Sequence, residues 1–177
     1  MRGIPFLLLG FALAGCRSNA ASAEPGAVLE PGRVRIEWSG SSSGRFAAQA
    51  VARWCATDTL VEILAMRADT GVGLILLVRD SIDAGDYPIA AARSFSNRRP
   101  GASLAVRWLD TSSVRGYEGV RGRVVLTAGG ALAGTFETLL RANGGPASDT
   151  LALRGELGGI TPVTADSLCG RWNRPGG

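Results

Sequence analysis

An alternation of apolar and polar residues with a period of two begins at residue 33 and constrains the fold more than any other feature. In residues 33–38, RVRIEW, Val34, Ile36 and Trp38 share one face of an extended segment, and charged residues share the other. Residues 102–108 show the same pattern. No stretch keeps a sustained helical period of 3.6 residues. The sequence therefore predicts half-buried β-strands.

Turn-forming residues separate the extended segments. Residues 122–128 and 131–141 are separated only by two glycines, which predicts a hairpin because primed turns need positive φ angles. Residues 73–78, GLILLV, predict a strand covered on both faces. The alanine-rich residues 46–55 would also suit a helix, but we expect a strand there. We predict an all-β fold with a single domain, either an antiparallel β-sandwich or a closed barrel.

The amino terminus has the outline of a secretory signal. A positively charged start, MR, precedes an apolar run from Ile4 to Ala14 that is too short to span a bilayer, which needs about 20 residues. The residues Leu13-Ala14-Gly15-Cys16 resemble the lipobox of bacterial lipoproteins, over the first 16 residues only. The resemblance implies cleavage before Cys16 and acyl chains, palmitate among them, on that cysteine. The alternative is an ordinary signal peptide that is cleaved later, after Ala20 or Ala23.

The resemblance also predicts where the protein resides. In lipoproteins an aspartate directly after the cysteine tends to retain the protein at the inner membrane, and Arg17 stands there instead. We therefore expect a protein anchored in the bacterial cell envelope, at the outer membrane rather than the inner, with the membrane as its partner through the acyl chains. The predicted organisation is a signal peptide over 1–15, a flexible tether over 16–32 and an all-β domain over 33–177.

Two further cysteines, Cys55 and Cys169, lie near opposite ends of the predicted domain. An exported domain enters an oxidising compartment, so we expect a disulfide between them. Such a bond closes a long loop and would stabilise the fold by about 4–5 kcal/mol on the chain-entropy model. The alternative is two buried thiols.

Missing residue types exclude several kinds of chemistry. All 19 basic residues are arginine, and there is no histidine. A Ser-His-Asp triad, a Cys-His pair, histidine-ligated metals and lysine Schiff bases are therefore ruled out. Removing Arg2 with the signal leaves 18 basic and 15 acidic side chains, a charge of +3, too small to predict nucleic-acid binding. We expect no cofactor and no metal.

Carboxylates could still support glycoside hydrolysis without histidine. The candidates are Asp58, Glu62 and Asp69, and a second group at Asp80, Asp83 and Asp86. The second group superficially resembles a calcium loop, but its spacing does not match one, and we favour a role in turn geometry.

Arginine and aromatic residues form the last candidate clusters. Either cluster could contact an anionic glycan or a lipid headgroup, although solvated side chains in exposed loops are the simpler interpretation. The first surrounds Phe95 with Arg93, Arg98 and Arg99, and the second is the segment 115–123 with Tyr117. We assign the tryptophans Trp38, Trp54, Trp108 and Trp172 to core packing, with a ligand-lining role as the alternative.

These features favour a lipid-anchored envelope protein with a non-catalytic structural or binding role, whose ligand and partner the sequence does not identify. One alternative is a β-barrel carrier of an apolar ligand. The other is a carboxylate-dependent hydrolase of envelope glycans.

Overall fold

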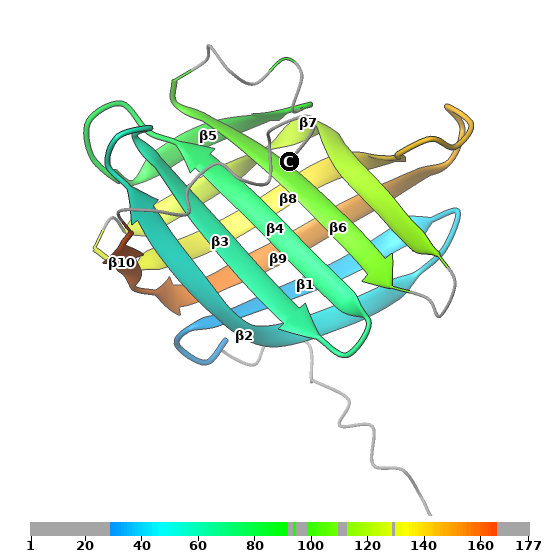
Figure 1. The fold of residues 1–177 in the computed structure, drawn as a ribbon, viewed down its shortest axis with the longest axis horizontal. Coiled ribbons are helices and arrows are strands. Elements are labelled where there is room, and N and C mark those ends of the chain that lie inside the picture. The colour runs from blue at the N-terminus through cyan, green and yellow to red at the C-terminus, as the bar shows by residue number, and fades with distance from the viewer. Residues whose placement is uncertain (1–28, 92–93, 95–98, 110–112, 129, 166–177) are drawn as a thin grey trace, which may run out of the picture.

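Residues 29–91, 94, 99–109, 113–128 and 130–165 are described by the computed structural model, and their strands form one continuous sheet (Figure 1). In chain order the strands are β1 (Arg33–Gly40), β2 (Gly44–Cys55), β3 (Leu60–Arg67), β4 (Thr70–Leu77), β5 (Gly85–Ala90), β6 (Gly101–Leu109), β7 (Val114–Ala128), β8 (Leu132–Ala142), β9 (Thr150–Ile160) and β10 (Pro162–Thr164).

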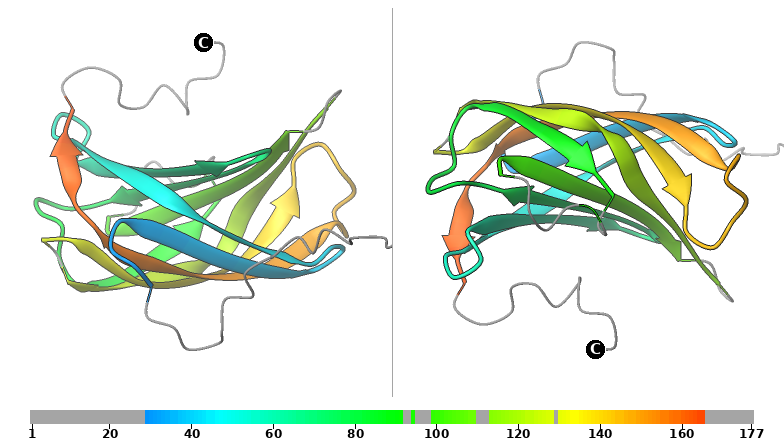
Figure 2. Two further views of the ribbon diagram at one scale, coloured as in Figure 1. Left: turned by 90° about the horizontal axis from the view of Figure 1, so that it is seen from below. Right: turned by 90° about the horizontal axis from the view of Figure 1, so that it is seen from above.

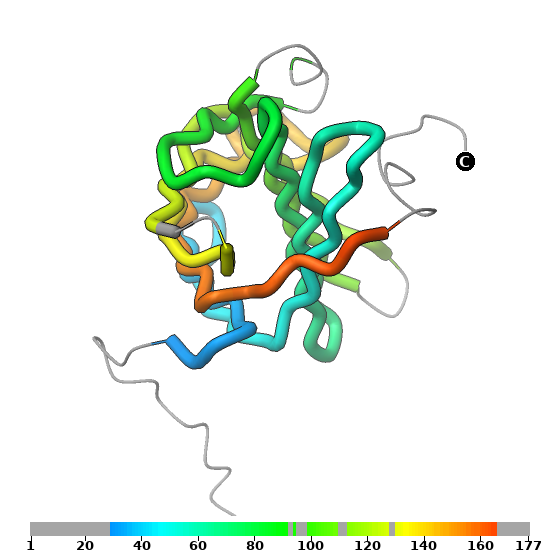
Figure 3. The backbone as a smooth tube through the Cα atoms, turned by 90° about the vertical axis from the view of Figure 1, so that its left-hand side faces the viewer, coloured from blue at the N-terminus to red at the C-terminus, as the bar shows by residue number. Residues whose placement is uncertain are grey.

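The sheet closes into a barrel because β1 pairs with both β9 and β2. The ring runs β1-β9-β8-β7-β5-β6-β4-β3-β2 and returns to β1. Figure 3 shows the backbone as a closed ring. Neighbouring strands in the ring are antiparallel, apart from a single parallel bridge between β5 and β6. The all-β prediction is confirmed, and of its two architectures the closed barrel is the one found.

Strand β7 is long enough to pair with two strands along one of its edges. Its first part pairs with β6, from Val114 to Glu118, and its last part pairs with β5, from Arg121 to Leu126. Between these parts the pairing with β8 shifts register, which marks a β-bulge that bends the strand. The segment 115–123 therefore lies within a strand, and its interpretation as an exposed loop was wrong.

Apolar side chains fill the inside of the barrel. Ile36, Leu104 and Leu140 are fully inaccessible to solvent, and the rest of the inward-facing core is nearly so. A barrel of about eight strands has an interior just wide enough for side chains. The described strands therefore enclose a packed core.

An aromatic cluster closes one end of this core. The ring centroids of Trp38 and Trp108 lie 5.3 Å apart, and Tyr117 packs edge-on against Trp108 at the same distance. Asp149 accepts hydrogen bonds from the hydroxyls of Tyr117, at 2.8 Å, and Ser41, at 2.6 Å. Trp54 also packs against the core, so the packing role predicted for these three tryptophans is confirmed, while Trp172 lies outside the described residues.

Several local predictions are confirmed. Residues 46–55 lie in β2, and β7 and β8 pair across the glycine turn. The strand predicted to be covered on both faces is β4, where Leu77 on the outward side is buried and Ile75 is half-buried. At the amino-terminal edge, Gly32 donates to the carbonyl of Gly158, so the end of the predicted tether already contacts the barrel.

The predicted signal peptide, Cys16 and the chain beyond residue 165 lie outside the described residues. Within the part that is described, no helix is long and apolar enough to cross a membrane.

Candidate binding groove on the outer face

The outer surface of the barrel has two contrasting sides, which Figure 2 shows on opposite sides of the core. The side formed by β1, β9, β8 and β7 is charged. Exposed ion pairs of this kind contribute little stability, but they keep the surface hydrated. The pairs are Arg154 with Glu37 at 2.7 Å, Arg123 with Glu137 at 3.2 Å and Arg35 with Glu156 at 3.4 Å.

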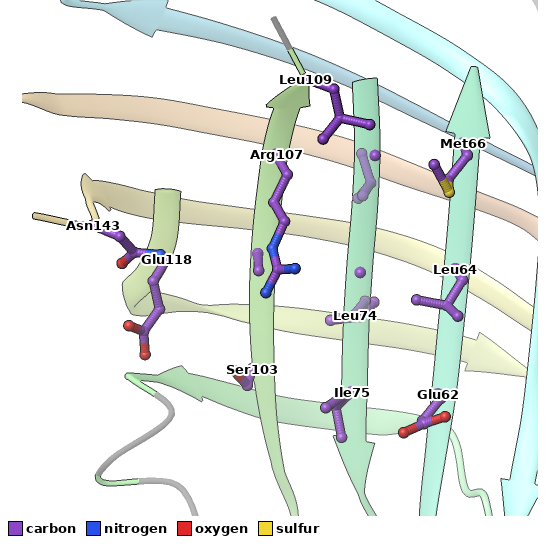
Figure 4. Close-up of a pocket in the computed structure, with 14 residues that line it drawn as sticks. Glu62, Leu64, Met66, Leu74, Ile75, Ser103, Arg107, Leu109, Glu118 and Asn143 are labelled. Atoms are coloured by element: carbon purple, nitrogen blue, oxygen red, sulfur yellow. The ribbon is translucent and has the colours of Figure 1, made fainter. Parts of the chain in front are cut away.

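The side formed by β3, β4 and β6 instead carries a groove of about 340 Å³ (Figure 4). Its walls are mostly apolar, and the polar side chains of Glu62, Ser103, Arg107, Glu118 and Asn143 also line it. The side chains that point out of the sheet into it include Leu64, Met66, Ile75, Arg107, Leu109 and Glu118.

Two glycines of β4 form the floor of the groove. Leu64 on β3 pairs with Gly73, which pairs with Ala105 on β6, so small residues occupy the centre of the outer face. A Cβ at Gly73 would lie 3.6 Å from Leu64 Cδ2, and one at Gly71 would lie 3.7 Å from Met66 Cγ. Both are ordinary contacts, so the backbone does not require glycine here. The groove exists because these two positions lack side chains.

One end of the groove is enclosed and the other is open. At the enclosed end Glu62 is only 2% accessible although it points out of the sheet, between Arg53 on β2 and Ile75 on β4. At the open end Met66 and Leu109 are 63% and 45% accessible. Val114, which pairs with Leu109, extends this exposed apolar patch onto β7.

A second buried cluster adjoins the enclosed end. Cys55, Leu60 and Leu77 occupy paired outward positions on β2, β3 and β4, and Ile75 packs against them. Because Ile75 also lines the groove, the cluster and the groove form one continuous surface. Cys55 is thus placed on the outer face, while its predicted partner Cys169 lies outside the described residues, and the disulfide stays a prediction.

Arg99, a candidate for anion binding, has a structural role. Its guanidinium donates to the backbone carbonyls of Val78 at 2.6 Å, Thr59 at 2.7 Å and Asp58 at 2.8 Å. These bonds join the chain before β6 to the β2–β3 turn and the end of β4. The other members of its cluster, Arg93, Phe95 and Arg98, lie outside the described residues. Tyr117 of the second cluster is buried inside the barrel.

The carboxylates proposed for hydrolysis do not converge. Asp58 lies in the turn before β3 and Asp69 in the turn after it, and Glu62 lies between them along the strand. A strand rises about 3.3 Å per residue, so the two turns are roughly 25 Å apart. Paired carboxylates in glycosidases lie within about 10 Å of each other.

In the other acidic group Asp83 serves a turn, as we favoured, whereas Asp86 lies in β5. Asp83 accepts from the hydroxyl of Ser81 at 2.9 Å, and its carbonyl accepts from the hydroxyl of Tyr87 at 2.8 Å. Burial is the main cause that raises the pKa of Tyr87. Within the described ranges no three Cys, Asp or Glu side chains are grouped to hold a metal ion.

No family model matches this chain, and comparisons with curated proteins and with solved structures gave no match either. The geometry therefore carries the functional argument. The groove was not predicted from the sequence, although the alternation in TGVGLIL contains its signal. Once Val72 and Leu74 are assigned to the core, Gly71 and Gly73 must face outward.

Proposed function

We propose that this protein is a lipid-anchored component of the bacterial cell envelope, and that its barrel is a non-catalytic binding module. The open end of the groove, with the exposed patch of Met66, Leu109 and Val114, is its interaction surface. This surface is the observation that carries the proposal, because contiguous exposed apolar side chains rimmed by polar groups are typical of interaction sites. The partner would offer an apolar surface.

Two features of the barrel support a role without catalysis. Its interior is occupied by packed side chains, and the candidate carboxylates Asp58 and Asp69 lie at opposite ends of β3. The charged side formed by β1, β9, β8 and β7 is suited to face solvent, which leaves the groove side for an interaction. A tether from Cys16 would keep that side within reach of other envelope components.

The binding proposal is tested with the apolar dye 8-anilinonaphthalene-1-sulfonate and the full-length mature protein. We expect the dye to fluoresce on the wild type, and the signal to fall about threefold or more in the double variant Met66→Ser/Leu109→Ser. Val163→Ser is the matched control, because Val163 is equally exposed but lies on β10. Equal signals in the double variant and the control would contradict the assigned surface.

The lipid anchor is tested separately. We expect mass spectrometry of the mature protein to show an amino-terminal Cys16 that carries acyl chains, and the variant Cys16→Ser to lose membrane attachment. A mature protein with an unmodified amino terminus would overturn the assignment.

A carrier of an apolar ligand is the second candidate, and the closed barrel favours it. The filled interior weighs against it, because a carried molecule needs the space that side chains such as Leu104 and Leu140 occupy. Native mass spectrometry after purification distinguishes the two. A stoichiometric small molecule that survives in Met66→Ser/Leu109→Ser would support the carrier.

A further inference from the structure

We propose that the enclosed end of the groove is the docking site of the chain's own carboxy-terminal segment, residues 166–177, with Trp172 seated over the glycine floor. This inference does not rest on the proposed function, because it holds whether or not the open end binds a partner.

The described chain ends next to β2. Strand β10 runs parallel to the end of β2, with Thr164 opposite Trp54, and Ala165 donates to the carbonyl of Trp54 at 3.0 Å. The chain therefore leaves the barrel beside Cys55. Cys169 follows only four residues later, within reach of Cys55 at about 3.3–3.6 Å per residue.

Several side chains on the outer face of the barrel are buried. Cys55, Leu60, Leu77 and Glu62 all point out of the barrel, yet each is almost inaccessible. A strand pair leaves its outward side chains open unless another part of the chain lies over them. The carboxy-terminal segment begins at this cluster and supplies the covering side chains.

The distance from Cys55 to the groove floor is short enough for Trp172 to cover it. A disulfide holds its two Cα atoms about 5.5 Å apart, and three further residues span about 10 Å. Ile75 lies two strands across from Cys55, about 10 Å at the usual strand spacing, and two residues along, so Trp172 can reach it. Its indole would cover the apolar floor between Leu64 and Ile75.

The charge of the carboxy-terminal segment is complementary to that of the groove walls. The segment contains Arg171 and Arg174 and has no acidic residue after Asp166, while the groove walls carry Glu62 and Glu118. Arg171 lies two residues from Cys169, which matches the distance from Cys55 to Glu62, one strand across and two residues along. The remaining basic wall residue, Arg107, lies toward the open end.

The disulfide between Cys55 and Cys169 would form by thiol–disulfide exchange. The thiols of Cys55 and Cys169 lose two protons and two electrons to a protein disulfide of the oxidising compartment, which is reduced to two thiols while the new sulfur–sulfur bond forms.

The test is tryptic cleavage of the bond between Arg171 and Trp172 in the full-length mature protein, followed by intact mass. We expect the wild type to be cleaved about tenfold or more slowly than Gly73→Leu, in which a side chain fills the floor. The matched control is Ala152→Leu, which places the same side chain at an outward position of β9 and should stay protected. Because Gly73→Leu could fail to fold, Leu64→Ser serves as a second variant with the same expected loss of protection.

Equal cleavage rates in the wild type and in folded groove variants would overturn the proposal. Native mass spectrometry tests for the alternative occupant of the groove, a second copy of the chain. A dimer of the wild type that Gly73→Leu dissociates, with Arg171 cleaved freely in both, would assign the groove to a second copy and refute the docking of residues 166–177.

Discussion

Replacing Arg99 with alanine should weaken the barrel far more than replacing an ordinary surface arginine. Three short hydrogen bonds from one guanidinium hold the carbonyls of Asp58, Thr59 and Val78. Val78 is fully buried, so its carbonyl would be left without a donor, which costs about 1–3 kcal/mol. The other two carbonyls can regain water, and each loss is about 0.5–1 kcal/mol. We expect a total destabilisation of about 2–5 kcal/mol.

Urea unfolding followed by tryptophan fluorescence measures this loss. With a slope of about 2 kcal/mol per molar urea, the midpoint should fall by about 1–2.5 M in Arg99→Ala. Arg99→Lys should recover little, because an ammonium lacks the planar fork that serves three acceptors. Arg67→Ala is the control, since Arg67 makes a single exposed contact of 3.4 Å to the carbonyl of Ala47, and its midpoint should barely move. If Arg99→Ala and Arg67→Ala shifted the midpoint equally, the bracing role of Arg99 would be refuted.

Three further predictions concern the packing of the core, the dependence of stability on pH and the bulge in β7. Leu104→Ala should lower the unfolding free energy by about 3–5 kcal/mol in urea titrations, because Leu104 is fully buried, and a loss under 1 kcal/mol would contradict a packed interior. Hydrogen bonds from Ser41 and then Tyr117 lower the pKa of Asp149, so the stability from this group is complete above its unfolded pKa near 3.9 and is lost as pH falls through the lower folded value. As the pH is lowered from 6 to 2, the urea midpoint should therefore fall less steeply in Tyr117→Phe than in the wild type. Identical pH profiles would refute the contribution of the Tyr117–Asp149 hydrogen bond. Gly122→Ala should destabilise the fold by about 2 kcal/mol in thermal unfolding, because φ there is +149° and a Cβ would collide with the carbonyl of Glu137, whereas Gly130→Ala should be neutral.

The strands were predictable from sequence because each side chain's face follows from its position. Alternation identified β1, and the glycine pair identified the β7–β8 hairpin. Ring closure was not predictable, because the pairing of β1 with β9 is a long-range contact that local patterns do not encode. The insertion of β5 beside β7 was missed for the same reason.

The candidate site was harder to predict than the fold. The groove depends on register, since Leu64, Gly73 and Ala105 form one row only when three strands are aligned. The arginine of residue 99 was correctly noticed but wrongly assigned, because its partners are backbone carbonyls, which carry no sequence signal.

The position of β1 in the ring sets the order in which this protein can mature. β1 is the first strand to be synthesised, but one of its edges has no partner until β9 exists, as the pairing of Val34 with Leu157 requires. Until then an unpaired strand edge stays open to other chains, and folds dominated by such distant contacts form slowly. A chain that stalls during synthesis before β9 emerges should therefore be aggregation-prone, and truncation within β9 should be more damaging than truncation after β10.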